Sequence, residues 1–208
     1  MPTWLSGSRG KIIAGVVAAV ACVLIGYVAG WLTPRLTDPG EHSADTGFAR
    51  DMSTHHAQAV EMGMIAHIKG STPGIRTLGG DIAMTQQAQI GMMDAWLVDW
   101  GLSNNSDDPP MAWMPDGAEA VNGNLMPGMA TREEIRQLEG EQGQEFDTLF
   151  LQYMLRHHLG GIHMARAVLE TDPEPEVRSL AETMIKNQSG EVDTLKKMLA
   201  DLGAQPLN

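Results

Sequence analysis

The sequence predicts an all-α protein in which two duplicated helical hairpins form an antiparallel four-helix bundle, preceded by one N-terminal transmembrane helix. Fifteen Met against three Phe and two Tyr are typical of a helical interior packed by flexible side chains. Residues 12–32 form an apolar run without a charge. Residues 48–101 match residues 150–203 at a constant offset of 102, without a gap and with twelve identical pairs, which indicates an internal duplication.

The apolar run at residues 12–32 is long enough to cross a membrane, because helical residues advance about 1.5 Å each and the hydrocarbon core is roughly 30 Å thick. Arg9 and Lys11 precede the run, and all twenty-six acidic residues follow it. The positive-inside rule therefore predicts a cytoplasmic tail at residues 1–11, a single-pass anchor in the cell membrane, and an extracytoplasmic position for the rest. Since the run continues ten residues beyond Cys22, an uncleaved anchor is favoured over a cleaved signal peptide or a lipoprotein signal processed at Cys22.

The extracytoplasmic part is acidic and has no cysteine, because the single Cys22 lies in the apolar run. It therefore forms no disulfide and offers no thiolate, so a metal site there must use His, Met, carboxylate or amide groups. Fourteen basic residues less Arg9 and Lys11 leave twelve, against twenty-six acidic ones. This charge argues against nucleic acid and anionic lipid surfaces as partners.

Residues 33–47 are rich in Pro, Gly and small polar side chains, which predicts a flexible tether. The bundle itself is expected at residues 48–203. After its first helix, Ser71 or Thr72 is placed to cap the second helix, with Pro73 in the first turn.

A Met-rich loop at residues 102–130 joins the two halves, and it has too many Pro, Gly and Asn for a long helix. The residues TREE at 131–134 predict a capping box that opens a short helix before the third long one. The last helix is expected to open at Asp172 and Pro173 and to end before Gly203.

Each half carries a pair of adjacent histidines within a Met-containing helix, in the stretches DMSTHHAQAVEM and YMLRHHLGGIHM. Residues three or seven positions apart share a face of a helix, so one His and two Met of each half point toward the core, and the second His lies at the edge of that face. The first and third helices of a bundle can bring the two sets together near its axis. The sets are Met52, His55 and Met62 with His56 at the edge, and Met154, His157 and Met164 with His158 at the edge.

Imidazole and thioether groups without a thiolate suit copper, because thioethers favour Cu(I) and imidazole binds either oxidation state. The competing interpretation is structural: each His makes a hydrogen bond in the core and each Met only packs. It requires four buried rings to find partners, at about 1–3 kcal/mol for each polar group left unsatisfied. The pattern therefore favours a copper site, with Cu(I) preferred and Cu(II) also accommodated.

The stretch FLQYMLRHHLGGIHMARAVL, the doubled HH-x5-M pattern and the MPGM loop resemble the His- and Met-rich family catalogued as domain of unknown function 305. The resemblance covers about residues 46–203. It implies a ferritin-like four-helix bundle in a bacterial envelope, with a link in some members to copper binding and tolerance. One position departs from the duplication, since His163 stands where the first half has Glu61. The positions that match the family motif, and so the implied metal ligands, are His55, His56, Met62, His157, His158 and Met164.

Eight further residues are candidate additional ligands or supporting groups. Gln86 and Gln188 occupy equivalent positions and either hydrogen-bond a histidine or form a polar hydrogen bond across the bundle without a metal. The two loop methionines either donate to the metal or only pack. Because histidine binds metal only when neutral, we expect copper affinity to fall as the pH drops through roughly 6 to 5. The eight residues are Met52, Met154, His163, Glu61, Gln86, Gln188, Met126 and Met129.

The leading hypothesis is a membrane-anchored extracytoplasmic protein that binds copper in order to buffer, sequester or deliver it, without catalysis. Its partners are then the membrane, through the N-terminal helix, and a copper-requiring enzyme or another membrane protein. A second hypothesis is an accessory or docking subunit of a membrane complex, since Gly26 and Gly30 have a spacing that suits helix packing. A metal-dependent redox enzyme is a third, although the sequence lacks the Glu-x-x-His pairs of a ferritin-like di-iron oxidase and the C-x-x-C-H motif of haem c.

Overall fold

The computed structural model describes residues 8–123 and 125–207. The predicted cytoplasmic tail lies outside the described residues over positions 1–7. The chain separates into two compact units, Met1–Asp38 and Pro39–Asn208.

The described part of the first unit forms one helix, α1 (Ser8–Thr37). Its segment Ser8–Trp31 is long and apolar enough to cross a membrane, and none of the most apolar stretch is buried within the protein. A continuous apolar surface of this kind is stable only when lipid or protein covers it. This helix is therefore a candidate membrane span or signal anchor.

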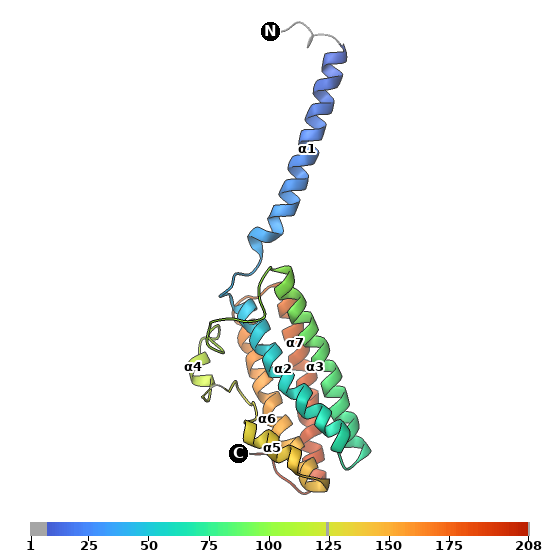
Figure 1. Cartoon of the computed structure of the whole chain (residues 1–208), viewed down its shortest axis with the longest axis vertical. Coiled ribbons are helices and arrows are strands. Elements are labelled where there is room, and N and C mark those ends of the chain that lie inside the picture. Colours follow the sequence, from blue (N-terminus) through green and yellow to red (C-terminus); the bar gives the residue numbers. More distant parts are fainter. Residues whose placement is uncertain (1–7, 124, 208) are drawn as a thin grey trace. The chain divides into compact units, whose positions relative to one another are not determined.

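The second unit contains four long helices that lie side by side and two short helices in the connection between them (Figure 1). α2 packs on α3 and α6, and α6 packs on α5 and α7. The all-α class predicted from the sequence is confirmed. The helices of this unit are α2 (Ala44–Lys69), α3 (Pro73–Asp99), α4 (Gly117–Ala120), α5 (Arg132–Gly140), α6 (Gly143–Leu169) and α7 (Pro175–Asp201).

The irregular segment before the bundle is shorter than the tether predicted at residues 33–47. α1 continues to Thr37 and α2 begins at Ala44, so residues 38–43 alone connect the two helices. α2 begins early because the Ser43 side chain accepts a hydrogen bond from the Thr46 backbone N–H and caps the helix.

Two of the predicted helix starts are confirmed. The Thr72 side chain accepts the Ile75 N–H at the start of α3, directly before Pro73. Thr131 and Glu134 form both hydrogen bonds of a capping box at the start of α5.

The predicted start of the last helix is wrong. α7 begins at Pro175, whereas Asp172 lies in the left-handed region with a φ of 56°. The Glu174 N–H donates to Asp45 Oδ1 at the beginning of α2, and this contact draws the chain away from a helical path before Pro175.

The core of the bundle consists of two separate hydrophobic clusters, each with side chains from all four long helices. One cluster contains Phe48, Met52 and Met164. The other contains Met62 and Met154. On every long helix, buried polar residues lie between the two clusters. We call this set the polar layer; its members are His55, His56, Gln86, Gln89, His157, His158 and Gln188.

Candidate metal centre

The polar layer brings together the four histidines that the sequence predicts as ligands. His55 and His56 come from α2, and His157 and His158 come from α6. All four side chains are 0% exposed. The apolar stripe of each helix is interrupted at the same level, so the histidines meet in the middle of the core.

One histidine from each half lies at the centre of the layer. The ring centroids of His55 and His157 are 3.8 Å apart, with an angle of 33° between the planes. His56 and His158 lie further out, with ring centroids 6.3 Å and 6.5 Å from those of their neighbours on the same helix. The arrangement follows the internal duplication.

Hydrogen bonds fix which ring nitrogen of three histidines carries the proton. His55 Nε2 lies 3.0 Å from the carbonyl oxygen of Pro127. A carbonyl oxygen only accepts, so Nε2 of His55 carries the hydrogen and Nδ1 of the neutral ring holds the lone pair. His56 Nε2 donates in the same way to Gln89 Oε1 at 2.7 Å. His158 Nε2 donates to Glu191 Oε2 at 2.5 Å.

The remaining ring nitrogens are buried without a hydrogen-bond partner among the residues that the structure describes. We call them the orphan nitrogens. A buried polar atom without a partner destabilises the fold by about 1–3 kcal/mol, so a group of them in one layer needs an explanation. The orphan nitrogens are Nδ1 of His55, His56 and His158 and both ring nitrogens of His157.

Methionine sulfur atoms belong to the clusters on both sides of the polar layer. Met52 and Met164 are in one cluster, and Met62 and Met154 are in the other. All four side chains are 0% exposed. The donor set of this region is therefore imidazole nitrogen flanked by thioether sulfur, a combination that suits copper.

A short segment of the Met-rich loop covers the central histidine pair. We call residues 126–130 the strap. Gly128 of the strap has a φ of 76°, and a Cβ at this position would lie 2.3 Å from the carbonyl oxygen of Arg156. Gln58 fixes the end of the strap through two hydrogen bonds with the backbone of Ala130, at 2.9 Å and 2.7 Å. The strap thereby holds the Pro127 carbonyl against His55.

The two strap methionines differ in their burial. Met126 is 5% exposed and belongs to the same cluster as Met52. Met129 is partly buried and packs against that cluster. These positions fit both interpretations that the sequence leaves open, a soft donor and a packing residue.

Burial keeps His55, His56 and His157 neutral. Removal from water lowers the pKa of His55 from its ordinary value of 6.5 to about 4. It lowers the pKa of His56 to about 3 and the pKa of His157 well below 6.5. Protons therefore compete for these nitrogens only in more acidic solution than the pH range of 6 to 5 that an ordinary histidine leads us to expect.

The structure does not bring all the predicted supporting residues to the layer. The side chains of Glu61 and His163 are exposed, and His163 Nε2 lies 3.6 Å from Asp116 Oδ2. Gln86 and Gln188 are buried in the layer, and a Cβ at Gly161 would lie 2.7 Å from Gln188 Oε1 and 3.3 Å from His55 Cε1. Neither glutamine is a hydrogen-bond partner of a histidine.

The histidine partners that sequence reasoning missed are Gln89 and Glu191. They lie three residues beyond Gln86 and Gln188 on α3 and α7. Gln89 and Glu191 are related by the same offset of 102 as the two halves. This equivalence of two polar residues is the sequence signal that could have identified them as histidine partners.

Carboxylate and imidazole groups alone do not form a metal site here. In the part of the chain that the structure describes, no three His, Cys, Asp or Glu side chains are grouped to hold a metal ion. Thioether sulfur from the flanking clusters would have to complete the coordination, which favours soft Cu(I) over harder divalent ions.

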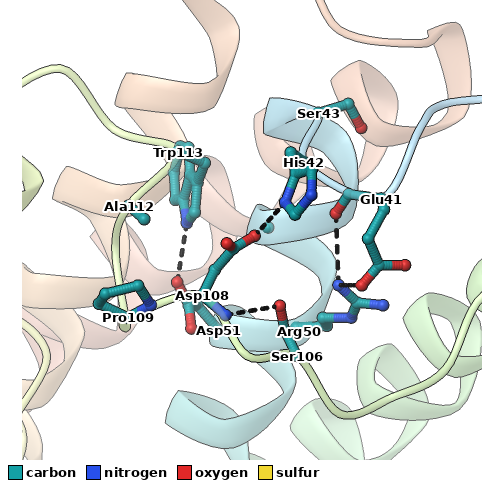
Figure 2. Close-up of a pocket in the computed structure, with 11 residues that line it drawn as sticks. Glu41, His42, Ser43, Arg50, Asp51, Ser106, Asp108, Pro109, Ala112 and Trp113 are labelled. Carbon is teal, nitrogen blue, oxygen red and sulfur yellow. Dashed lines mark hydrogen bonds and ion pairs between the residues drawn. The ribbon is translucent and has the colours of Figure 1, made fainter.

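A separate surface pocket lies between the start of α2 and the Met-rich loop (Figure 2). Asp51 Oδ2 accepts hydrogen bonds from the Met111 N–H at 2.7 Å and from Trp113 Nε1 at 2.9 Å. His42 Nδ1 lies 2.6 Å from Asp108 Oδ2. The lining of this pocket contains none of the predicted metal ligands, and its contacts fasten the loop to α2.

Fold and site together define an all-helical protein with a buried histidine layer between methionine-containing clusters. The chain belongs to the family described as Domain of unknown function (DUF305), which matches residues 45–199. No curated protein sequence matches the chain.

Several solved structures share the fold. A DUF305 protein from Streptomyces coelicolor, described as secreted, is 41% identical, with a TM-score of 0.75 over 81% of this chain and 99% of that chain. A DUF305 fragment from Deinococcus radiodurans is 28% identical, with a TM-score of 0.65 over 78% of this chain and 99% of that one. CopM in its Cu(II)-bound form is 27% identical, with a TM-score of 0.59 over 76% of this chain and 96% of that one. CopM has also been solved in a Cu(I)-bound form, which is 25% identical.

Proposed function

We propose that this protein is a membrane-anchored, extracytoplasmic copper-binding protein that buffers, sequesters or delivers copper. The observation that carries the proposal is the set of orphan nitrogens in the polar layer. Five buried lone-pair or N–H positions on four histidines destabilise the bundle unless something binds them. A metal ion binds nitrogens that hold a lone pair, and each neutral ring of the layer has one such nitrogen.

The flanking methionines and the family support copper as the metal. Imidazole and thioether donors together bind Cu(I) well, and imidazole also binds Cu(II). CopM, a similar structure, has been solved with Cu(I) and with Cu(II). A copper-related role is therefore the one that the site chemistry and the family both favour. The proposed ligands are His55, His56, Met62, His157, His158 and Met164, with Met52, Met154 and Met126 as further thioether donors.

Burial of the donors favours binding over catalysis. A metal ion that acts on a substrate needs an open coordination position. Here the histidines are 0% exposed, and the strap covers the central pair. Copper that enters this layer is shielded from water and from other reactants, as suits storage or transfer.

The proposed location follows from α1 and from the charge distribution. Arg9 and Lys11 begin α1, and every acidic residue follows its apolar segment. We expect added protease to degrade the bundle in spheroplasts whose membrane is intact. Protection of the bundle under those conditions would contradict the extracytoplasmic position.

The decisive experiment measures copper affinity of the full chain in mild detergent. Cu(I) is titrated anaerobically against a chromophoric chelator, and the wild type is compared with His55→Ala/His157→Ala. We expect tight Cu(I) binding in the wild type and its loss in the double variant. His67→Ala is the matched control, because His67 is an exposed histidine on α2 and its removal should leave the affinity unchanged.

Circular dichroism of each variant tells loss of binding from loss of fold. A folded double variant that still binds Cu(I) as tightly as the wild type would refute the proposed ligands. A wild type that binds no copper would refute the proposed function and would favour a docking role for the bundle.

A further inference from the structure

We infer that Glu191 is a positioning residue that makes the His158 half of the duplicated site the stronger binding position for Cu(II), whereas Gln89 leaves the His56 half neutral and better suited to Cu(I). This inference rests on the proposed function. It assigns different roles to two halves that a symmetric duplication would make alike.

The two residues occupy equivalent places in the structure. Gln89 on α3 and Glu191 on α7 are separated by the offset of the duplication. Each accepts a hydrogen bond from Nε2 of the outer histidine of its own half, at 2.7 Å for Gln89 and 2.5 Å for Glu191. Both outer histidines consequently present Nδ1, one of the orphan nitrogens, to the interior.

The chemical difference between the halves lies in the charge of the acceptor. A carboxylate that accepts the N–H of a ligating histidine makes the ring a stronger donor and holds it in one tautomer. A neutral amide fixes the same tautomer without adding a charge. Negative charge beside the metal stabilises the doubly charged ion more than the singly charged ion.

Burial makes the contrast effective. The side chain of His158 is 0% exposed and that of Glu191 is 25% exposed, so their interaction is only partly screened by water. Gln89 is 7% exposed. The two halves also differ at Glu61 and His163, but both of these side chains are exposed. The difference between Gln89 and Glu191, in contrast, is in direct contact with His56 and His158.

The test exchanges the two acceptors in the full chain and measures both affinities. Three variants are compared with the wild type: Glu191→Gln, Gln89→Glu, and the double exchange. Cu(II) affinity is measured by competition with glycine, and Cu(I) affinity by anaerobic competition with a chromophoric chelator.

We expect Glu191→Gln to weaken Cu(II) binding by about 10- to 100-fold, the usual effect of losing such a partner, and to weaken Cu(I) binding less. Each tenfold change in the ratio of the two affinities corresponds to about 59 mV in the reduction potential of the bound copper. We expect the double exchange to return the ratio toward the wild-type value, because the carboxylate then serves the equivalent histidine of the other half. Spectra of the Cu(II) form should keep nitrogen coupling from histidine in every variant.

Equal losses of Cu(I) and Cu(II) affinity in Glu191→Gln would indicate a merely structural role and overturn the inference. If the Cu(II) spectrum of Glu191→Gln lacks an oxygen ligand that the wild type has, the inference is overturned too, since Glu191 then binds the metal directly. If the wild type binds no copper, the proposed function fails, and the positioning role is judged in the copper-free chain by ¹⁵N NMR. There, His158 must be protonated at Nε2 in the wild type and must populate a second tautomer in Glu191→Gln; an unchanged tautomer would overturn it.

Discussion

Replacing His157 by Phe should make the copper-free bundle more stable and less sensitive to acid. His157 is the one layer histidine whose two ring nitrogens are both orphan nitrogens in the described structure. Its ring stacks on that of His55 with 3.8 Å between centroids, and an apolar ring of similar shape can take this place. Removing two unsatisfied buried atoms should contribute roughly 1–3 kcal/mol, less any cost of the larger ring.

The change in the free energy of unfolding with pH is a sharper test than its value at one pH. The change does not depend on how well the new ring packs. Burial lowers the pKa of His157 well below its ordinary value of 6.5. Above pH 6.5 this histidine is neutral in both the folded and the unfolded chain. As the pH falls below 6.5, the unfolded chain binds a proton at this position and the folded chain does not, so the free energy of unfolding decreases. At about 1.4 kcal/mol per pH unit, His157 alone should lower the free energy of unfolding by about 2 kcal/mol between pH 7.5 and pH 5.0.

The assay is urea unfolding followed by circular dichroism, on metal-free full chain in detergent at both pH values. We expect His157→Phe to gain about 2 kcal/mol relative to the wild type on going from pH 7.5 to pH 5.0. His67→Phe is the control, because His67 is an exposed histidine of α2 that lies outside the polar layer. Equal losses of stability in the wild type and in His157→Phe would refute the conclusion that His157 is held neutral in the core.

Three further predictions concern the strap, a helix cap and proton competition. Gly128→Ala places a Cβ 2.3 Å from the Arg156 carbonyl oxygen at a φ of 76°. It should destabilise the bundle by at least about 1–3 kcal/mol in urea unfolding and weaken Cu(I) binding, and unchanged stability would contradict the strap geometry. Thr131→Ala removes the capping box of α5 and should lower the free energy of unfolding by about 1 kcal/mol in the same assay, and unchanged stability would contradict the cap. Because burial lowers the pKa of His55 to about 4, Cu(I) affinity of the folded chain should differ little between pH 7.5 and 5.5, and a tenfold loss at pH 5.5 would refute this.

The helices and the histidine layer could be predicted because their signals are local and periodic. Thr72 before Pro73, and Thr131 three residues before Glu134, satisfy backbone N–H groups of their own helices, so these starts do not depend on tertiary contacts. The paired histidines interrupt apolar stripes at equivalent positions of two related helices. Their meeting in the core follows from the duplication.

The errors arose where tertiary contacts decide. Pro173 and Pro175 both suit a first turn, and the contact of the Glu174 N–H with Asp45 selects the later start. Gln86 and Gln89 lie on nearly the same face of α3. Which of them contacts a histidine therefore depends on how α3 is rotated about its axis relative to α2. The sequence alone does not contain that rotation.

The exposed position of His163 could have been found from helix geometry alone. It lies six residues beyond His157, and six steps of about 100° place it roughly 120° away from the face that enters the layer. Glu61 has the same relation to His55. The neighbouring Met62 and Met164 return to the core because seven steps complete nearly two turns.

The position of the polar layer explains why such a destabilising set of groups is compatible with a stable fold. Each of the two hydrophobic clusters contains side chains from α2, α3, α6 and α7, so apolar packing joins the four helices on both sides of the polar layer. The layer between them can therefore contain unsatisfied nitrogens without opening the ends of the bundle. A metal ion that binds the orphan nitrogens of the folded chain stabilises it by mass action, so copper should raise the free energy of unfolding. The same histidines that make the metal-free bundle weaker in acid thus make its stability depend on copper, which is the behaviour expected of a protein that holds this metal.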